Sequence, residues 1–88
     1  MRHAARVDDC QPEIVKALRA IGVRVTVLKW PVDLLCSHRG QWFLLECKDA
    51  DGALNKNQVE FIAEHTGPVH VVRSPLEALK AILGEAMR

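Results

Sequence analysis

A chain of 88 residues has room for one small domain, in which only about 60–65% of the unfolded chain's surface becomes buried. The net charge of +1, with both signs interspersed, neither demands nor excludes a nucleic-acid partner, and the 49% hydrophobic content excludes a disordered composition. No apolar run approaches the roughly 18–20 residues of a membrane span. The three cysteines, Cys10, Cys36 and Cys47, form no C-x-x-C pair, and no signal peptide is present, so we expect reduced thiols and a cytoplasmic protein.

The first predicted element is a helix that ends at Gly22. Residues 1–7 are polar and basic and are predicted to form a loose arm. Asp8 is a candidate N-cap with Gln11 as its capping-box partner, and the apolar face is formed by Ile14, Val15, Leu18 and Ile21. Glu13 lies in the first turn, where a carboxylate is favourable to the helix dipole without any other role.

Three strands are predicted next. Valines alternate with other residues over 23–28, and Trp30-Pro31 interrupts the strand. A second strand covers 32–36, a turn falls at 38–40, and a third strand covers 41–48. The spacing indicates an antiparallel meander.

The remaining chain predicts a helix, a strand and a last helix. Asn55 and Gln58 form a capping box before a stripe of Val59, Ile62 and Ala63. A strand covers 69–72. Ser74-Pro75 begins the last helix, with an inward face of Leu76, Leu79, Ile82 and Leu83. The order α-β-β-β-α-β-α predicts a single α/β domain over 1–88 with a mixed sheet.

The chemistry is concentrated around two carboxylates and a lysine. Glu46 and Lys48 are two apart in a strand and share a face, and Asp33 lies on the neighbouring strand of the hairpin. Two strands joined in this way could bring both carboxylates to one Mg²⁺, with Mn²⁺ as a substitute, and the main-chain carbonyl of Cys47 could be a further ligand. Lys48 could then orient a water or stabilise developing negative charge. Carboxylates that hold a metal, together with such a lysine, are the groups that hydrolysis of a phosphodiester requires. Glu13 is the best candidate for holding a second ion.

Each of these residues also has a structural interpretation. Asp33, Glu46 and Lys48 could be an ion pair on an edge strand, where inward charges prevent aggregation. Gln58 could act only as a capping residue. Lys56 is unfavourable at a helix start, which suggests a phosphate contact. Trp30 and Trp42 are more typical of core or interface anchors than of base stacking, and His38 is expected to be solvated.

The pattern Asp33…Glu46-Cys47-Lys48 resembles the signature of the PD-(D/E)XK nuclease superfamily. With Gln11-Pro12-Glu13-Ile14-Val15, Gly22 and Gln58 it resembles the small phage and bacterial virus-type replication-repair (VRR-NUC) nucleases. The resemblance implies a restriction-endonuclease-like core, a homodimer and branched or structured DNA as substrate, in a bacterial or phage-infected cell. It also implies metal binding by Glu13, Asp33 and Glu46, catalysis by Lys48, and a role in orienting the site for Gln58. Candidate nucleic-acid contacts are Lys56, Arg39 and Arg6.

Two departures keep other functions open. The family has proline immediately before the aspartate, whereas here Val32 separates Pro31 from Asp33, and the loop after Lys48 has two acids and no base. A catalytically inactive DNA-binding module is therefore one alternative to a metal-dependent DNA endonuclease. A small, non-enzymatic assembly domain is another.

Overall fold

The computed structural model describes residues 7–84, which form a four-stranded mixed sheet with three helices. The elements are α1 (Gln11–Ala20), β1 (Arg24–Val27), β2 (Leu34–His38), β3 (Gln41–Cys47), α2 (Lys56–Glu64), β4 (Val69–Val72) and α3 (Pro75–Leu83). The predicted fold class and order α-β-β-β-α-β-α are therefore confirmed. Arg6 and most of the predicted arm lie outside the described residues.

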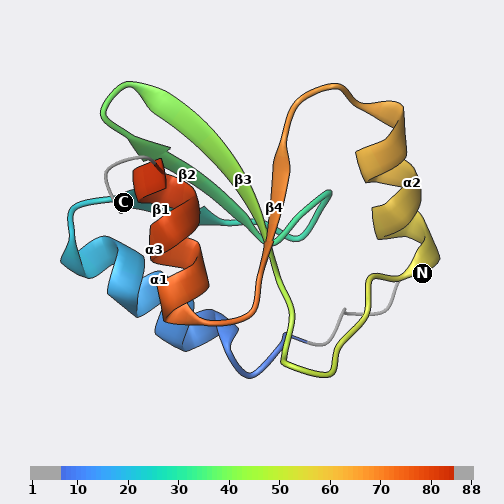
Figure 1. Cartoon of the computed structure of the whole chain (residues 1–88), viewed down its shortest axis with the longest axis horizontal. Helices are drawn as coiled ribbons and strands as arrows, with labels where there is room; N and C mark the ends of the chain where they lie inside the picture. The colour runs from blue at the N-terminus through green and yellow to red at the C-terminus, as the bar shows by residue number, and fades with distance from the viewer. Residues whose placement is uncertain (1–6, 85–88) are drawn as a thin grey trace.

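The strands lie in the order β1-β2-β3-β4 (Figure 1). The first three pair antiparallel, and β4 pairs parallel to β3 after a crossover that contains α2. β2 and β3 are joined by Arg39 and Gly40, which have φ of 50° and 81°. Positive φ at both positions of a two-residue loop gives a turn whose twist matches the strands, so this hairpin has a well-defined register.

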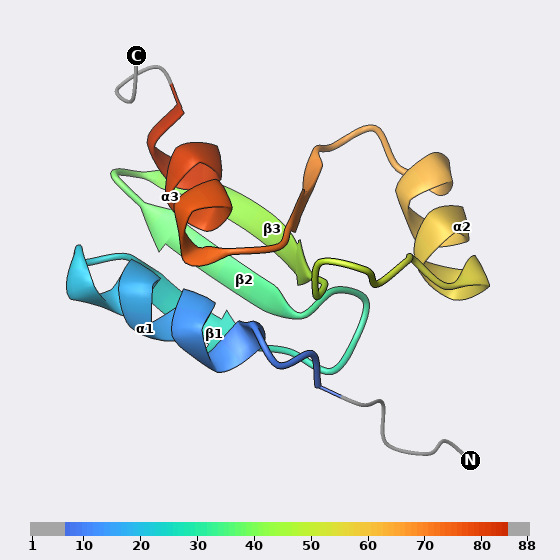
Figure 2. The same cartoon turned by 60° about the horizontal axis from the view of Figure 1, so that its bottom comes forward.

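One face of the sheet carries the hydrophobic core, because α1 and α3 lie side by side on it (Figure 2). Alternate residues of each strand point to this face, including Leu45 and Cys47 of β3, and the others point away. The buried cluster comprises Ile14, Leu18, Val23, Leu34, Cys36, Leu45, Cys47, Val72, Ala78 and Ile82.

Helix α2 stands apart from the other two helices and contains no buried residue (Figures 1 and 2). Its capping box of Asn55 and Gln58 is confirmed. The predicted buried stripe is wrong, because Val59 and Ala63 are exposed and Ile62 is half-buried. Phe61 instead contacts Trp30, with ring centroids 6.1 Å apart. An amphipathic pattern predicts a helix but does not ensure that its apolar face is covered within the same chain.

Three further local predictions are corrected. The N-cap of α1 is Cys10, which makes no side-chain cap, and Asp8 accepts a hydrogen bond from Gln11 through its backbone carbonyl. Leu76 is exposed, and Ala78 takes the buried position on α3. Of the two roles predicted for the tryptophans, core or interface anchor, the core role is wrong, since Trp30 and Trp42 are 61% and 72% exposed. None of the described helices has the length and apolarity to cross a membrane.

A candidate acidic site at the end of the central hairpin

The register of β2 and β3 brings Asp33 next to Glu46. Leu34 pairs with Leu45, so the next step along both chains sets Asp33 opposite Glu46. Glu46 and Lys48 project from the face of β3 that is turned away from α1 and α3, while Cys47 between them points into the core. The valine between Pro31 and Asp33 therefore does not prevent the two carboxylates from meeting.

The main chain fixes Asp33 in this position. Its Oδ2 accepts a hydrogen bond from the backbone N–H of Cys47 at 2.8 Å, across the end of the hairpin. A side-chain hydrogen bond with Asp33 also favours the protonated form of the Glu46 carboxyl and so raises its pKa. A carboxylate held by a strand N–H cannot turn away freely, so the pair is set by the backbone register.

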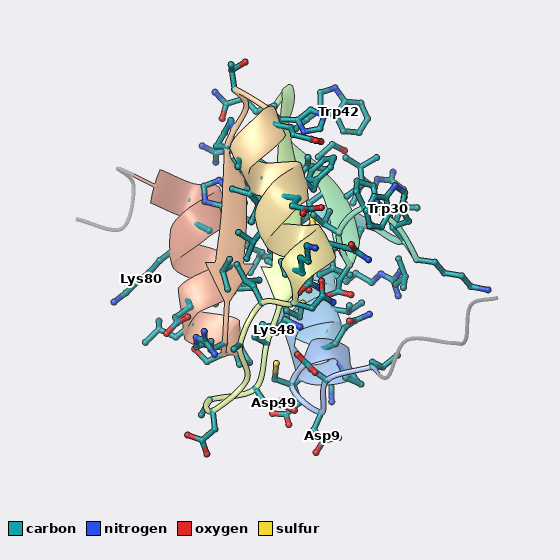
Figure 3. All side chains as sticks on the ribbon, turned by 90° about the vertical axis from the view of Figure 1, so that its right-hand side faces the viewer. Asp9, Trp30, Trp42, Lys48, Asp49 and Lys80 are labelled. Carbon is teal, nitrogen blue, oxygen red and sulfur yellow. The ribbon has the colours of Figure 1, made fainter. Side chains whose placement is uncertain are left out.

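Two side chains meet at one oxygen of Glu46. Gln58 at the start of α2 donates from Nε2 to Oε2 at 2.5 Å, and Nζ of Lys48 lies 3.7 Å from the same atom. Gln58 also accepts from the backbone N–H of Asn55 as the capping-box partner. The capping role and the contact with the acid are therefore made by opposite ends of one amide. Figure 3 shows Lys48 near the N-terminal end of α2.

Burial makes this acid unusual. Glu46 is only 2% exposed, and the pKa of its carboxyl is raised to about 8, with desolvation by burial as the largest cause. The negative charge of Asp33 and the hydrogen bond between the two carboxyls act in the same direction, and the positive charge of Lys48 opposes them. Without a further cation, the pair retains a proton near neutral pH.

A third acid, Asp8, acts on the same place and was not predicted to be there. Its charge also raises the pKa of Glu46, and its Oδ2 is buried without a hydrogen-bond partner among the described residues. Gln11, which is 6% exposed, likewise has a buried Oε1 with no such partner. From the sequence, Asp8 was predicted only as a helix cap, because its effect on Glu46 depends on a tertiary arrangement that no local pattern reveals. We name Asp8, Asp33, Glu46, Lys48 and Gln58 the acidic site.

Other predicted site residues lie elsewhere. Glu13 is exposed in the first turn of α1 and is not among the charges that shift the pKa of Glu46. Lys56 is exposed at the first position of α2, near Gln58 in sequence. Arg39 lies in the turn at the far end of the hairpin, more than about 15 Å along β3 from Glu46.

The acidic site suits a hard cation better than the cysteines do. Burial raises the pKa of the Cys10 and Cys36 thiols to about 11 and raises that of Cys47 further, so these thiols stay protonated and are poor ligands and nucleophiles. Among residues 7–84, no three His, Cys, Asp or Glu side chains are arranged around one metal position. Mg²⁺ is usually held by one or two carboxylates together with substrate and water, so the Asp33–Glu46 pair meets that requirement.

Comparison with protein-family models, with curated proteins and with solved structures gives no match. The case for a function therefore rests on the acidic site itself.

Proposed function

We propose that the protein is a Mg²⁺- or Mn²⁺-dependent endonuclease that hydrolyses phosphodiester bonds in DNA. The observation that carries the proposal is the meeting of Asp33, Glu46 and Lys48 at the end of one hairpin, with Glu46 buried and Gln58 bonded to it. An ion pair that only protected a strand edge would not need a carboxyl–carboxyl contact, since that contact destabilises the charged form of both acids.

In this proposal each residue of the acidic site has a role that follows from its position. Asp33 and Glu46 would hold the cation, which when bound supplies an activated water and neutralises charge on the phosphate. Lys48 lies beside the acids, where its ammonium can stabilise negative charge that develops on the phosphate. Gln58 orients the Glu46 carboxylate, and the N–H of Cys47 orients that of Asp33.

Substrate and assembly belong to the same proposal. Structured or branched DNA as substrate and a homodimer are what the resemblance to VRR-NUC nucleases implies, and the unpaired cysteines favour the cytoplasm. The sheet face that carries Glu46 is not covered by α1 or α3, and α2 leaves Val59 51% exposed, so apolar surface is available to a second copy or to DNA.

The test is cleavage of labelled branched, single-stranded and duplex DNA in Mg²⁺ or Mn²⁺. We expect Glu46→Gln, Asp33→Asn and Lys48→Met to lose at least 100-fold in rate, because each removes a charge at the reacting phosphate. Glu64→Gln, which changes an exposed acid of α2, is the matched control and should retain full activity.

Two more variants test which acid near α1, Asp8 or Glu13, contributes to metal binding and cleavage. Asp8→Asn should reduce the rate and weaken Mn²⁺ binding, because Asp8 acts on Glu46, whereas Glu13→Gln should do neither. Equal activity of the wild type, Glu46→Gln and Lys48→Met would refute the endonuclease. DNA binding without metal-dependent cleavage would instead identify an inactive DNA-binding module, and absence of both would leave an assembly domain.

A further inference from the structure

A row of three residues crosses the sheet at the end opposite to the acidic site. Arg24 of β1 pairs with Ser37 of β2, and Ser37 pairs with Trp42 of β3. Directly opposed residues of antiparallel strands project from the same face, so the three side chains lie side by side. The face is that of Glu46, because Trp42 and Glu46 are four residues apart in one strand.

The order large, small, large makes a hollow in this row. Ser37 is short, while Arg24 and Trp42 on either side are long and exposed. The hollow is an open pocket of about 280 Å³, to which the β2–β3 turn contributes Arg39. We name it the hairpin pocket; its polar and aromatic lining is formed by Arg24, Ser37, His38, Arg39, Gln41 and Trp42.

The charged residues that line the hairpin pocket are all positive, and one side of the pocket is formed by an aromatic residue, Trp42. None of the described residues that line the hairpin pocket is acidic, and two are arginines. Trp42 is 72% exposed, so its indole is open to a stacking partner. Guanidinium groups beside an exposed aromatic ring are the combination that binds a phosphate and the base attached to it.

We propose that the hairpin pocket binds an unpaired nucleotide of a DNA strand, with its base stacked on Trp42 and its phosphate paired with Arg24 and Arg39. The proposal rests on the proposed nuclease function for its choice of DNA, and it adds a second contact that lies about 13 Å along β3 from Glu46, from four residues at about 3.3 Å each. Trp42, Leu44, Glu46 and Lys48 share that face, so a strand held in the pocket can run along β3 to the acidic site.

The two tryptophans lie apart, so the fluorescence of Trp42 can be measured separately from that of Trp30. Trp42 lies at one end of the view and Trp30 beside α2, and the chain has no other tryptophan. In a Trp30→Phe variant all indole fluorescence therefore comes from Trp42. The experiment titrates this variant with a ten-nucleotide oligothymidylate in EDTA, where no metal-dependent cleavage occurs, at several salt concentrations.

We expect saturable quenching of Trp42 fluorescence. Adding Arg24→Ala or Arg39→Ala to this background should weaken binding at least fivefold and reduce the slope of log affinity against log salt by about 0.7–1 for each lost phosphate contact. Trp42→Ala in the otherwise wild-type chain, followed with a labelled oligonucleotide, should weaken binding about tenfold, since that is what loss of one stacked base removes. Lys80→Ala, which removes an exposed charge from α3, is the matched control and should bind normally.

The outcomes separate this proposal from the endonuclease. Binding is measured in EDTA, where the acidic site has no metal to act with, so binding through the hairpin pocket stands even if no cleavage is found with Mg²⁺ or Mn²⁺. Absence of quenching, or an equal loss for Lys80→Ala, would overturn the pocket. Tighter binding of duplex DNA or of an RNA oligonucleotide than of oligothymidylate would overturn the assignment to unpaired DNA.

Discussion

At the scale of single residues, Glu46 is the centre of the molecule's chemistry. It is a buried acid whose neighbours include two further carboxyl groups, Asp33 and Asp8, and one cation, Lys48. Desolvation and the charges of the two acids together outweigh the cation, so the pKa of the Glu46 carboxyl is raised and a proton stays on it near neutral pH. A divalent cation would replace that proton, because it offers two positive charges at the same place.

This arrangement predicts a stability that falls as pH rises. The pKa of Glu46 goes from 4.5 as its ordinary value to about 8 in the folded protein, so between these values the folded state holds a proton that the unfolded state has released. The free energy of unfolding should then decrease by up to about 1.4 kcal/mol per pH unit across that window. Thermal unfolding measured from pH 5 to pH 8.5, compared with Glu46→Gln, isolates this contribution, since glutamine carries no titrating proton.

Added Mn²⁺ provides the opposite test of the same residue. A ligand that binds only the folded state raises the unfolding temperature, and the rise should be larger at pH 8 than at pH 5.5 because proton and cation compete for Glu46. If the unfolding temperatures of the wild type and of Glu46→Gln depended on pH in the same way, the prediction that folded Glu46 retains a proton would be wrong.

At the scale of elements, α2 and α3 have equivalent caps and different anchoring. Asn55 accepts from the N–H of Gln58, and Ser74 accepts from that of Glu77. Helix α3 contributes Ala78 and Ile82 to the core, whereas α2 has no fully buried residue and contacts the rest of the domain through Gln58 and Phe61. The loss of a cap should therefore have different consequences in the two helices.

We predict that Ser74→Ala lowers the global free energy of unfolding by about 1 kcal/mol, because α3 unfolds only with the core. Asn55→Ala removes a cap of similar strength, but it should mainly accelerate amide exchange in residues 56–64 and change global stability by less than about 0.5 kcal/mol. Hydrogen exchange and chemical unfolding of both variants check this. A global loss in Asn55→Ala equal to that in Ser74→Ala would contradict the view of α2 as a loosely attached element.

The elements also mark what sequence reasoning could reach. Local signals were sufficient where local interactions decide, as for the Asn55 and Ser74 caps, the turn at Arg39–Gly40 and the order of helices and strands along the chain. The burial of Val59 and Leu76 was predicted incorrectly, because periodicity states which residues share a face and not what covers it. The meeting of Asp33 and Glu46 followed from the hairpin, whereas the approach of Asp8 depends on contacts some 40 residues away in the chain.

At the scale of the whole molecule, three distant segments join at the end of β3. The carboxylate of Asp49 accepts from the backbone N–H groups of Asp9 and Cys10 at 3.0 and 2.9 Å, and Figure 3 shows Asp49 and Asp9 close together. The guanidinium of Arg73 donates to the carbonyls of Asp49 and Gly52, both at 2.7 Å. This junction ties the segment before α1, which includes Asp8, to the loop that follows Lys48.

The junction gives a prediction that connects stability with the acidic site. Asp49→Ala removes two charge-assisted hydrogen bonds and should lower the free energy of unfolding by about 1–3 kcal/mol. It should also weaken Mn²⁺ binding, because the segment that carries Asp8, whose charge acts on Glu46, is then less firmly positioned. In an Asp8→Asn background, Asp49→Ala should still destabilise the fold but should have no further effect on Mn²⁺ affinity, since the group that it positions is already neutral. Calorimetric titration of the four proteins of this double-mutant cycle measures the coupling, and strictly additive effects on affinity would show that Asp49 stabilises the fold without positioning Asp8.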